Sequence, residues 1–453
     1  MTEEIPARLL IIGGGPAGTM AATVAASLGA HVALVEDSII GGAAHLLDCI
    51  PSKTMVASSV RRASVQDSAK LGFVVDEGHM DLARLASHID TISSDLANSA
   101  TTILEDQGVT ILRGRGSFTG PHTAVAQTAD GEVELGFDTA LISTGSAPRV
   151  PDWAVPDGNR ILTTRDAYDF DEIPEHMVVV GSGVTGVEFV NIFSSMGSRV
   201  SLLVSRQQVL PHRDPEVAAA IESDFLERGV SLLKGARAIG IDIEGDQVVV
   251  HLEDGRMVTG SHALLAIGSV PLSAGLGLEE AGVEHDHGYV GVDEFQRTSQ
   301  PHIYAAGDVT GQMPLSSVAS MQGRKIAHHL MGFQVRPLDY AKVAQAVFTE
   351  PEIASVGLEE ADITAAGRSI RTTKVPFAAN SRSVIQGNTH GFVKVFSDPV
   401  THEILGGTIV GHRASELIGI LALAVQGRLR VEAVVETLMV HPSLSESITE
   451  AAE

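Results

Sequence analysis

One pattern of apolar and polar positions occurs twice in this chain. In the first copy, an apolar run at 9–12 leads into a glycine-rich turn at 13–18, and a second apolar run follows at 32–35. In the second copy, the same three parts lie at 177–180, 181–186 and 200–204. In both copies the next glycine, Gly29 or Gly197, lies 11 residues after the turn. This spacing predicts a strand, a glycine turn, a helix and a second strand in each copy.

Both glycine turns have the spacing G-x-G-x-x-G. The first glycine permits a tight turn, the second lets the backbone approach a pyrophosphate, and the third lets the helix pack close to the strand. The helix N-terminus then attracts the phosphate charge. A single copy is a weak signal, because ordinary glycine turns match it as well. Two copies in the same context predict two dinucleotide sites.

The residue after the second strand separates the two sites. Glu36 lies 23 residues after Gly13, where a carboxylate can accept hydrogen bonds from ribose hydroxyls. The same count from Gly181 reaches Val204, which is followed by Ser205 and Arg206. Without an acid at this place, and with Arg206 and Arg213 nearby, the second site is expected to tolerate the 2′-phosphate of NADPH. The alternative is that these arginines are ordinary surface charges.

The elements divide the chain into four predicted segments. Residues 143–148 close the first dinucleotide unit, and the proline-bearing stretch 149–156 is interpreted as a linker. A buried strand ending in a glycine and a carboxylate is expected at 303–308. After about residue 339 the pattern predicts strands and two helices without a phosphate loop, and the apolar stretch 417–425 is interpreted as a buried helix. The predicted boundaries are 1–150, 151–271, 272–338 and 339–453.

Composition and charge narrow the function classes. The chain has 453 residues, enough for roughly three domains. Its formal net charge is 31 − 56 = −25 without a basic stripe, which argues against binding to nucleic acid or to an anionic membrane. The apolar stretch 417–425 is shorter than the roughly 20 residues of a membrane span. The acidic residues 1–8 lack the basic region of a signal peptide.

Cysteine usage gives a sharper constraint. Cys49 is the single cysteine of the chain. This count excludes an intramolecular disulfide and a four-cysteine zinc site, and it favours a reducing cytoplasm. The seventeen histidines other than His441 show no ligand spacing, so no metal is expected.

Seven motifs in fixed order carry a family resemblance. They are the glycine turn 13–18, the segment 41–53, Thr144-Gly145, the turn 181–186 with Glu188 shortly after it, and the segments 305–308, 348–352 and 441–446. Over essentially its full length, the chain resembles the pyridine nucleotide-disulfide oxidoreductases of the dihydrolipoamide dehydrogenase and glutathione reductase type. The resemblance implies an α/β fold with two Rossmann-like domains, for FAD (1–150 and 272–338) and NAD(P)H (151–271). It also implies a C-terminal α+β interface domain (339–453) that forms a homodimer.

The resemblance also implies roles for individual residues. In the family, FAD binding corresponds here to Gly13, Gly15, Pro16, Ala17, Gly18, Glu36, Gly42, Ala43, Lys53, Gly116, Thr144, Gly145, Asp308, Leu315 and Ser316. Asp308 is expected to hold the ribityl chain, and a helix beginning near Ser316 to point its positive end at the flavin. NAD(P)H binding corresponds to Gly181, Gly183, Val184, Gly186, Glu188, Val204, Ser205, Arg206 and Gly268.

Five residues are expected to carry the chemistry. Lys53 is expected near the flavin N5, paired with Glu188, so that its charge stabilises the reduced ring. Cys49 corresponds to the flavin-proximal thiol, which can tune the flavin, form a sulfenic acid or only pack. His441 and Glu446 match an acid-base pair that reaches the partner subunit's site, where the histidine could protonate a reduced acceptor. The alternative for this pair is a hydrogen bond at the interface without catalytic work.

One departure from the family pattern decides the expected reaction. Ala44 stands five residues before Cys49, where the disulfide reductases have their second redox cysteine. Reduction of a disulfide substrate needs one thiol to attack and another to resolve the mixed disulfide, so this chemistry is not expected. Four local strings, at 41–44, 179–186, 267–271 and 445–452, together with Ser269, resemble the NAD(P)H quinone reductases of this family, which lack the disulfide.

The sequence therefore predicts an NAD(P)H:quinone oxidoreductase that transfers hydride through FAD by a ping-pong mechanism, with quinones or dyes as acceptors. The alternative uses Cys49 as a single reactive thiol in a peroxidase, an oxidase or a coenzyme A disulfide reductase. A third hypothesis is a flavoprotein that senses redox state and regulates a partner without catalysis.

Overall fold

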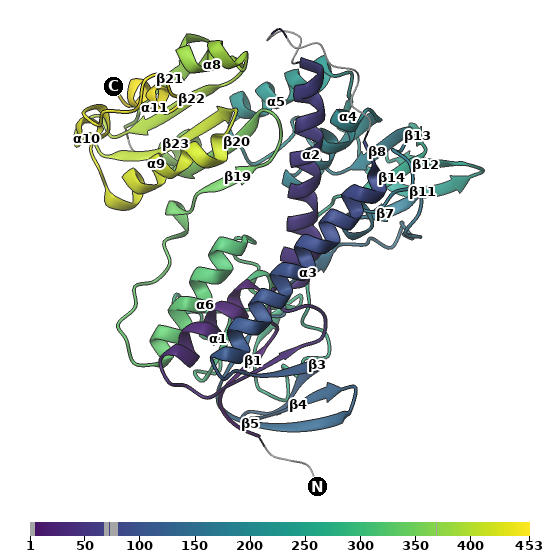
Figure 1. The fold of residues 1–453 in the computed structure, drawn as a ribbon, viewed down its shortest axis with the longest axis vertical. Coiled ribbons are helices and arrows are strands. Elements are labelled where there is room, and N and C mark those ends of the chain that lie inside the picture. Colours follow the sequence, from purple (N-terminus) through teal and green to yellow (C-terminus); the bar gives the residue numbers. More distant parts are fainter. Residues whose placement is uncertain (1–4, 68–71, 73–79, 368) are drawn as a thin grey trace. The chain divides into compact units, whose positions relative to one another are not determined.

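The computed structural model describes residues 5–67, 72, 80–367 and 369–453. The chain forms two compact units, and each unit is assembled from three separate stretches of sequence (Figure 1). The first unit comprises Met1–Pro51, Arg84–Arg149 and Ser269–Leu338. The second comprises Ser52–Ala83, Val150–Gly268 and Asp339–Glu453.

The first unit is built on a six-stranded sheet in the order β1-β2-β3-β4-β5-β18, in which β1 also pairs with β5. Its strands are β1 (Ile5–Ile12), β2 (Val32–Glu36), β3 (Thr110–Gly120), β4 (Thr123–Thr128), β5 (Gly131–Ile142) and β18 (Ile303–Ala305). The pairings β1–β2, β2–β3, β1–β5 and β5–β18 are parallel, whereas β4 pairs antiparallel with β3 and β5. The first predicted strand–helix–strand unit is confirmed.

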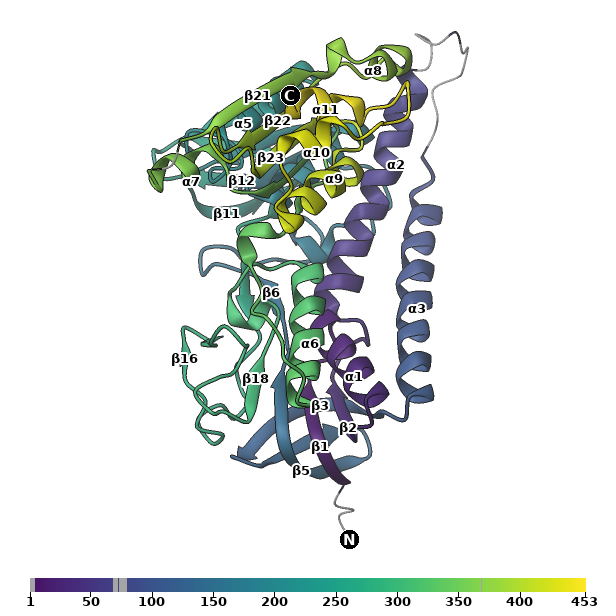
Figure 2. The ribbon, with the colours of Figure 1, turned by 90° about the vertical axis from the view of Figure 1, so that its left-hand side faces the viewer.

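Helices cover one face of this sheet. The helices α1 (Pro16–Ser27) and α6 (Ser316–Leu330) lie side by side, and α3 (Leu82–Asp106) runs beside α1 (Figure 2). Apolar side chains such as Ala21, Leu104 and Ile326 form their common core with the sheet. A second core on the other face contains Phe118 and Phe137.

Shorter elements complete the first unit. A π-helix, η1 (Ala44–Cys49), lies between the first βαβ segment and α2, and β6 (Ser146–Pro148) pairs antiparallel with β15 (Ser269–Pro271). The other short elements are β16 (His285–Asp286), β17 (Tyr289–Val290) and the 3-10 turn η4 (Asp308–Thr310).

The second unit begins with α2 (Ile50–Asp67), most of which lies in it, and contains a five-stranded parallel sheet in the order β10-β9-β8-β14-β7. The strands are β7 (Ile161–Thr163), β8 (His176–Val180), β9 (Arg199–Val204), β10 (Ser231–Lys234) and β14 (His262–Leu265). Its helices are α4 (Val184–Met196) and α5 (Pro215–Glu227). A three-stranded antiparallel sheet of β11 (Ala238–Glu244), β12 (Gln247–Leu252) and β13 (Met257–Gly260) and the 3-10 turn η3 (Thr164–Asp166) complete this part. The second predicted strand–helix–strand unit is therefore also confirmed.

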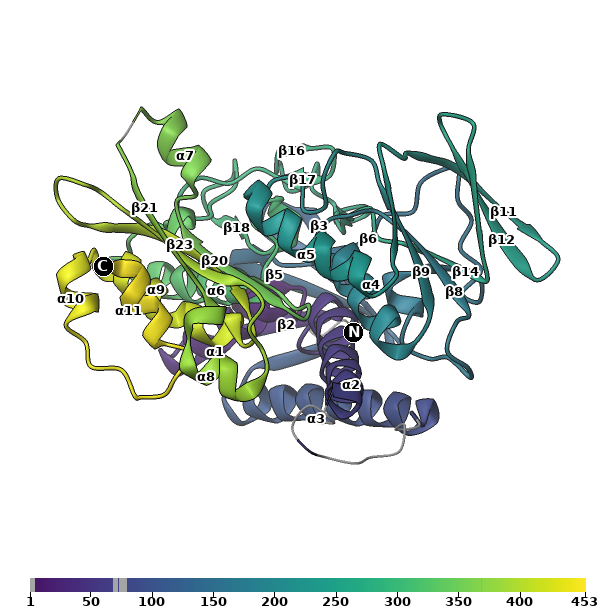
Figure 3. The ribbon, with the colours of Figure 1, turned by 90° about the horizontal axis from the view of Figure 1, so that it is seen from above.

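The C-terminal part of the second unit is an antiparallel sheet in the order β19-β20-β23-β22-β21. The strands are β19 (Gln345–Val347), β20 (Glu352–Gly357), β21 (Arg371–Pro376), β22 (Phe392–Ser397) and β23 (Ile404–Gly411). Helices α9 (Ala414–Gly427), α10 (Val431–Val435) and α11 (Glu446–Ala452) lie on one face of it (Figure 3). Helix α7 (Glu360–Ala365) lies on the other face, and α8 (Ser381–Gln386) and the 3-10 turns η5 (Tyr340–Lys342) and η6 (Phe377–Ala379) connect the strands.

Two predictions about this part were wrong. Five helices, not two, occur among its described residues, because the short ones begin at polar capping residues such as Asn380 and Glu359 rather than at an apolar repeat. The stretch 417–425 is helical but only half-buried. Ile418 and Leu421 pack on the sheet, whereas Leu423 on the opposite side is 73% exposed. No helix in the described part of the chain is long and apolar enough to cross a membrane.

Candidate active site

The first glycine turn leaves no room for a side chain at Gly13 or Gly18. Gly13 has a φ of +105°, and a Cβ there would lie 2.3 Å from the carbonyl oxygen of Ser143. A Cβ on Gly18 would lie 2.0 Å from the carbonyl oxygen of Gly13. Helix α1 begins directly after Gly15, which provides no side-chain cap. Its first backbone amides are therefore available to an anion, as the glycine spacing predicts.

The turn 41–42 lies directly on this helix N-terminus. Gly41 and Gly42 both have positive φ angles, and a Cβ on Gly42 would lie 2.6 Å from the Cα of Gly15. Ala43 follows with helical backbone angles and precedes η1. The buried Gly116 of β3 approaches the side chain of Ile12, so it lines the same end of the sheet.

Glu36 ends β2 beside the turn. Its Oε2 accepts a hydrogen bond from the Gly14 amide at 2.6 Å, and its Oε1 accepts one from the Ser38 amide at 2.8 Å. Burial raises the pKa of this carboxyl, and the two amide donors oppose that shift. The carboxylate is thus fixed at the edge of the turn, where the sequence predicts a ribose contact.

The carboxyl ends of β5 and β18 carry a third group of polar residues. Asp308 Oδ2 accepts a hydrogen bond from the Ser146 hydroxyl at 2.7 Å. The Gly307 amide donates to Oε1 of Gln322 at 2.7 Å, and Gln322 is fully buried on α6. Helix α6 begins at Ser316 after Leu315, as predicted. Gln322 was missed from the sequence, because one glutamine within a helix has no distinguishing signal.

The backbone of Thr144 lies against Gly13 of the first glycine turn. Its Oγ1 is buried and has no hydrogen-bond partner among the residues that the structure describes. The neighbouring Gly145 has a φ of +72° and an open Cβ position. A buried, unsatisfied hydroxyl next to an uncapped helix N-terminus fits a site for a polar nucleotide ligand.

Cys49 is the last residue of η1 and is half-buried. Ala44 is the first residue of the same π-helix, and a π-helix is defined by hydrogen bonds between residues five apart. Ala44 and Cys49 are therefore one π-turn apart along the backbone.

The second glycine turn repeats the geometry of the first in the second unit. Gly181 has a φ of +113°, and a Cβ there would lie 2.3 Å from the Ala266 carbonyl oxygen. A Cβ on Gly186 would lie 1.9 Å from the Gly181 carbonyl oxygen, whereas a Cβ on Gly183 would meet no described atom within 4 Å. Helix α4 begins at Val184 without a side-chain cap. The same anion-binding arrangement therefore occurs twice.

The last residue of β9 and the two residues after it differ in burial. Val204 is fully buried, so its side chain cannot contact a ligand, whereas Ser205 and Arg206 are exposed. Gly268 has a φ of +98° and an open Cβ position. The prediction for Arg213 was wrong. Its guanidinium donates to side-chain oxygens of the C-terminal part, and these acceptors are Ser355, Glu359 and Gln345 at 2.9, 3.0 and 2.6 Å.

Lys53 and Glu188 form the predicted ion pair. Lys53 Nζ lies 2.8 Å from Glu188 Oε2, and the two side chains are 28% and 6% exposed. The other carboxylate oxygen, Oε1, accepts a hydrogen bond from the Phe348 amide at 2.9 Å, and Lys53 Nζ lies 5.0 Å from the centre of the Phe348 ring. The lysine is therefore held in one position by a carboxylate that is itself fixed.

His441 and Glu446 are also paired. His441 Nδ1 lies 2.8 Å from Glu446 Oε1, and Glu446 Oε2 accepts a hydrogen bond from the Ser443 amide at 2.8 Å. The Ser443 amide and His441 hold the pKa of Glu446 below its usual value. The His441 side chain is 72% exposed within the single chain, so its ring is available to a second molecule.

Comparison with known proteins decides the family. The sequence pattern of the pyridine nucleotide-disulphide oxidoreductases matches residues 7–323, and that of their dimerisation domain matches residues 343–452. The chain belongs to the pyridine nucleotide-disulphide oxidoreductase family. It is a flavoprotein oxidoreductase of this family, whose members bind FAD and use NAD(P)H.

Several members of the family are similar over their whole length. A Mycobacterium tuberculosis protein named NAD(P)H dehydrogenase (quinone) is 44% identical over 458 aligned positions, which cover 98% of this chain and 93% of that protein. The dihydrolipoyl dehydrogenase of Chlorobaculum tepidum is 34% identical, with coverages of 98% and 95%. The crystal structure of LpdA from Mycobacterium tuberculosis matches with a TM-score of 0.94 and 43% identity, with coverages of 98% and 99%. The HOCl-induced flavoprotein disulfide reductase RclA from Escherichia coli matches with a TM-score of 0.89 and 27% identity, with coverages of 98% and 99%.

Helix α4, which carries Glu188, also takes part in a buried polar network that was not predicted from the sequence. Asn191 lies one turn after Glu188 on α4 and is fully buried. Its Oδ1 accepts hydrogen bonds from the Glu350 amide and from Arg228 Nη1, both at 3.0 Å. Arg228 also pairs with Asp224 at 2.8 Å. A signal was present, because Glu188, Asn191 and Ser195 repeat on one face of an otherwise apolar helix.

Asp224 makes this network sensitive to pH. Burial raises the pKa of Asp224 from 3.8 to about 6, although the nearby Arg228 opposes the shift. The folded state therefore holds this proton more tightly than the unfolded state does. The stability that this group contributes is complete below pH 4 and is lost as the pH rises through 6.

The variant Asp224→Asn removes the charge and tests this sign. The difference in the free energy of unfolding, variant minus wild type, should increase by up to about 3 kcal/mol from pH 4 to pH 8, because only the wild type loses stability as the carboxyl ionises. Denaturant unfolding at pH 4, 6 and 8 measures the difference. A difference between variant and wild type that does not change with pH would contradict the assigned shift.

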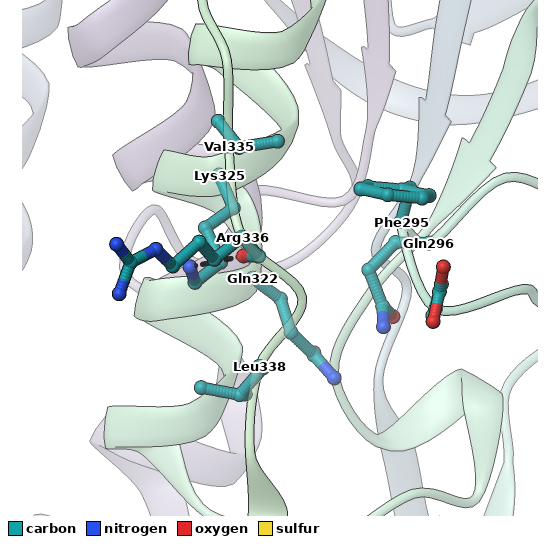
Figure 4. A pocket seen from close by; sticks show the side chains of 8 residues that line it. Phe295, Gln296, Gln322, Lys325, Val335, Arg336 and Leu338 are labelled. Carbon is teal, nitrogen blue, oxygen red and sulfur yellow. Dashed lines mark hydrogen bonds between the residues drawn. The ribbon is translucent and has the colours of Figure 1, made fainter. Parts of the chain in front are cut away.

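A small pocket in the first unit involves none of the predicted site residues (Figure 4). It is lined by Glu294, Phe295, Gln296, Gln322, Lys325, Val335, Arg336 and Leu338. Lys325 Nζ donates to the Arg336 carbonyl oxygen at 2.5 Å, and burial lowers the pKa of Lys325. This hydrogen bond connects α6 to the segment 335–338.

Proposed function

We propose that this flavoprotein is an NAD(P)H:quinone oxidoreductase that works without a redox-active disulfide. The proposal rests on one observation. Ala44, and not a second cysteine, stands one π-turn before Cys49, and the chain has no other cysteine. A disulfide substrate needs a second thiol to release the enzyme from the mixed disulfide. The 44% identical relative named NAD(P)H dehydrogenase (quinone) supports the same acceptor class.

The proposal assigns a task to each segment. Residues 1–150 and 272–338 bind FAD, with the uncapped N-terminus of α1 at the pyrophosphate and Glu36 at the ribose. Residues 151–271 bind NAD(P)H in the same way at α4. When bound, FAD accepts hydride from NAD(P)H and passes two electrons to the acceptor. In the assigned ping-pong order, oxidised nicotinamide leaves before the quinone is reduced.

The chain's own residues prepare these steps. We assign Lys53 the task of placing a positive charge beside the reduced cofactor, where negative charge develops. Glu188, held by the Phe348 amide, keeps this lysine oriented. Asp308 and Ser146, which are hydrogen-bonded to each other, would hold the polar chain of the cofactor, and the Thr144 hydroxyl would be a further donor to it.

The dimerisation domain supports a homodimer in which residues 339–453 form the interface. The exposed Leu423 of α9 and the exposed ring of His441 then contact the second copy. His441, oriented by Glu446, is assigned the proton that completes the hydroquinone. Cys49 is assigned a packing or tuning role next to the cofactor.

Coenzyme choice follows from the loop after β9. Val204 stands where the first unit has Glu36, and the exposed Ser205 and Arg206 follow it, so the enzyme is expected to accept NADPH as well as NADH. The single thiol fits the reducing cytoplasm.

An acceptor panel tests the proposed function. The holoenzyme is reduced anaerobically with one equivalent of NADH or NADPH and then mixed with menadione, lipoamide, oxidised glutathione or hydrogen peroxide. Flavin absorbance should return rapidly with menadione and slowly with the other three. Equal rates with either disulfide would refute the proposal, and a fast reaction with peroxide alone would favour the single-thiol alternative.

A further inference from the structure

The loop between β9 and α5, residues 205–214, lies against the second glycine turn. The Leu210 amide donates a hydrogen bond to the carbonyl oxygen of Ser182, which stands between Gly181 and Gly183, at 2.8 Å. Leu210 is buried and has a φ of +46°, a left-handed backbone conformation that leucine rarely adopts. A residue keeps such a conformation only where its surroundings fix it, and such residues cluster at ligand-binding sites. Contacts outside the β9–α5 loop therefore hold it at the turn.

Arg206 stands at the start of the β9–α5 loop. Its carbonyl oxygen accepts a hydrogen bond from the Gly235 amide at 3.1 Å, and the residue is exposed. Farther along the loop, the Val209 amide donates to Glu222 Oε1 on α5 at 3.0 Å. Arg206 is thus available to the 2′-phosphate of NADPH, and the course of the loop decides where its guanidinium lies.

Arg213 fixes the other end of the loop to the C-terminal sheet. Its Nη1 donates to Ser355 Oγ at 2.9 Å and to Glu359 Oε1 at 3.0 Å, and its Nη2 donates to Gln345 Oε1 at 2.6 Å. The side chains of Arg213 and Glu359 are each 19% exposed, so water screens this ion pair less than it screens a surface pair. The planar fork of the guanidinium fits these acceptors in one orientation.

A short series of contacts leads from Arg213 back to the glycine turn. The Arg213 amide donates to the Leu210 carbonyl oxygen at 2.9 Å, and Gln208 Nε2 donates to the Arg213 carbonyl oxygen at 3.1 Å. Residues 208–213 therefore form one connected turn, and Leu210 is the member that contacts Ser182. The C-terminal sheet is in this way linked to the second glycine turn through Arg213.

The start of α5 has an anchor of its own. Asp214 caps this helix by accepting a hydrogen bond from the Glu216 amide at 2.8 Å, and Lys394 Nζ lies 2.6 Å from Asp214 Oδ2. Lys394 also pairs with the Glu216 carboxylate. Because these contacts do not use the Arg213 side chain, its removal should free the loop while α5 stays on the C-terminal sheet.

We propose that Arg213 is a positioning residue for the coenzyme, which holds the β9–α5 loop where Arg206 can bind the 2′-phosphate of NADPH. The inference rests on the proposed function, because it needs NAD(P)H bound at α4. Arg213 does not bind the phosphate itself, since its guanidinium is engaged by the C-terminal sheet. The domain that forms the dimer interface thereby takes part in the choice between NADPH and NADH.

A double-mutant cycle of Arg213→Met and Arg206→Met tests the proposal. Anaerobic stopped-flow absorbance follows flavin reduction in the holoenzyme over a range of NADPH or NADH concentrations. The concentration dependence gives the Kd, and the plateau gives the maximal rate. We expect Arg213→Met to raise the Kd for NADPH about tenfold and the Kd for NADH less than about threefold, with the plateau unchanged. In an Arg206→Met background, Arg213→Met should add less than about twofold.

Three further variants separate position from charge and from folding. Arg213→Lys keeps the charge but not the planar fork, so it should recover part of the NADPH affinity. Glu359→Gln weakens the same contact from the C-terminal sheet, so it should also raise the Kd for NADPH, even if Arg213→Met fails to fold. The control Arg199→Met removes an exposed ion pair with Glu175 at the opposite end of β9, and it should bind both coenzymes like the wild type.

Three outcomes would overturn the inference. The Kd of Arg213→Met for NADPH could equal that of the wild type, the affinities for NADPH and NADH could fall equally, or the two substitutions could act independently in the double variant. The second result would give Arg213 a general structural role, and the third would separate it from Arg206. Normal NADPH affinity in Arg206→Met, or a wild type that does not bind NADPH, refutes instead the coenzyme choice of the proposed function. No electron acceptor is present, so none of these results depends on the quinone.

Discussion

Replacing Lys53 by methionine should slow flavin reduction by NAD(P)H about 100-fold. The substitution keeps the length of the side chain but removes the cation that we assign to the reduced cofactor, and a lost electrostatic partner of this kind typically costs a factor of 10²–10³. Stopped-flow absorbance under anaerobic conditions measures the rate. The expected loss lies in the maximal rate of reduction rather than in the affinity for NAD(P)H, because Lys53 acts on charge that develops during the transfer.

The same substitution leaves Glu188 buried with one remaining donor, the Phe348 amide. Lys53→Met should therefore also lower the free energy of unfolding by about 2–3 kcal/mol. The double variant Lys53→Met/Glu188→Gln removes the unpaired charge and should recover stability without recovering the rate. A double variant that regains the rate, or a single variant that reduces flavin as fast as the wild type, would contradict the assigned electrostatic role.

Replacing Gly183 by alanine should raise the Kd for NAD(P)H about 100-fold while the protein stays folded and keeps its FAD. A Cβ at this position meets no described atom, so the protein itself tolerates the methyl group. The loss is expected because the methyl group stands where the backbone must approach the pyrophosphate. Titration of the holoenzyme with NADH in the absence of an acceptor measures the affinity.

Gly186→Ala provides the matched contrast. Its Cβ would lie 1.9 Å from the Gly181 carbonyl oxygen, so this variant should disturb the fold of the turn and lower the melting temperature. Gly183→Ala should melt like the wild type. Normal NADH affinity in Gly183→Ala would show that the second glycine turn is not the pyrophosphate site.

Local features of the sequence were predicted well. The two glycine turns could be found because their tight contacts impose glycine at positions that are close in sequence, such as Gly13 and Gly18. The start of α6 at Ser316 and the pairing of Lys53 with Glu188 were implied by the family resemblance. The roles of these residues stay predictions until the variants above are measured.

Contacts between distant parts of the sequence could not be predicted. Arg213 was expected near the coenzyme, but its acceptors Ser355, Glu359 and Gln345 lie more than 130 residues away along the chain. The Asn191–Arg228–Asp224 network was also missed, although its members lie within 37 residues of one another and a polar repeat on α4 includes Asn191. The stretch 417–425 was expected to be a buried helix, but Leu423 is exposed in the single chain, because hydropathy cannot show whether the cover comes from the same chain or from a second copy.

The central claim is that electrons leave the enzyme from the flavin and not from a thiol. The most direct test is the reoxidation of the reduced Cys49→Ser holoenzyme by menadione, followed by flavin absorbance in a rapid-mixing experiment. We expect a rate within about twofold of the wild type, since Cys49 has no resolving thiol and takes no part in the transfer. A loss of 100-fold or more, with FAD content and reduction by NADH intact, would contradict it.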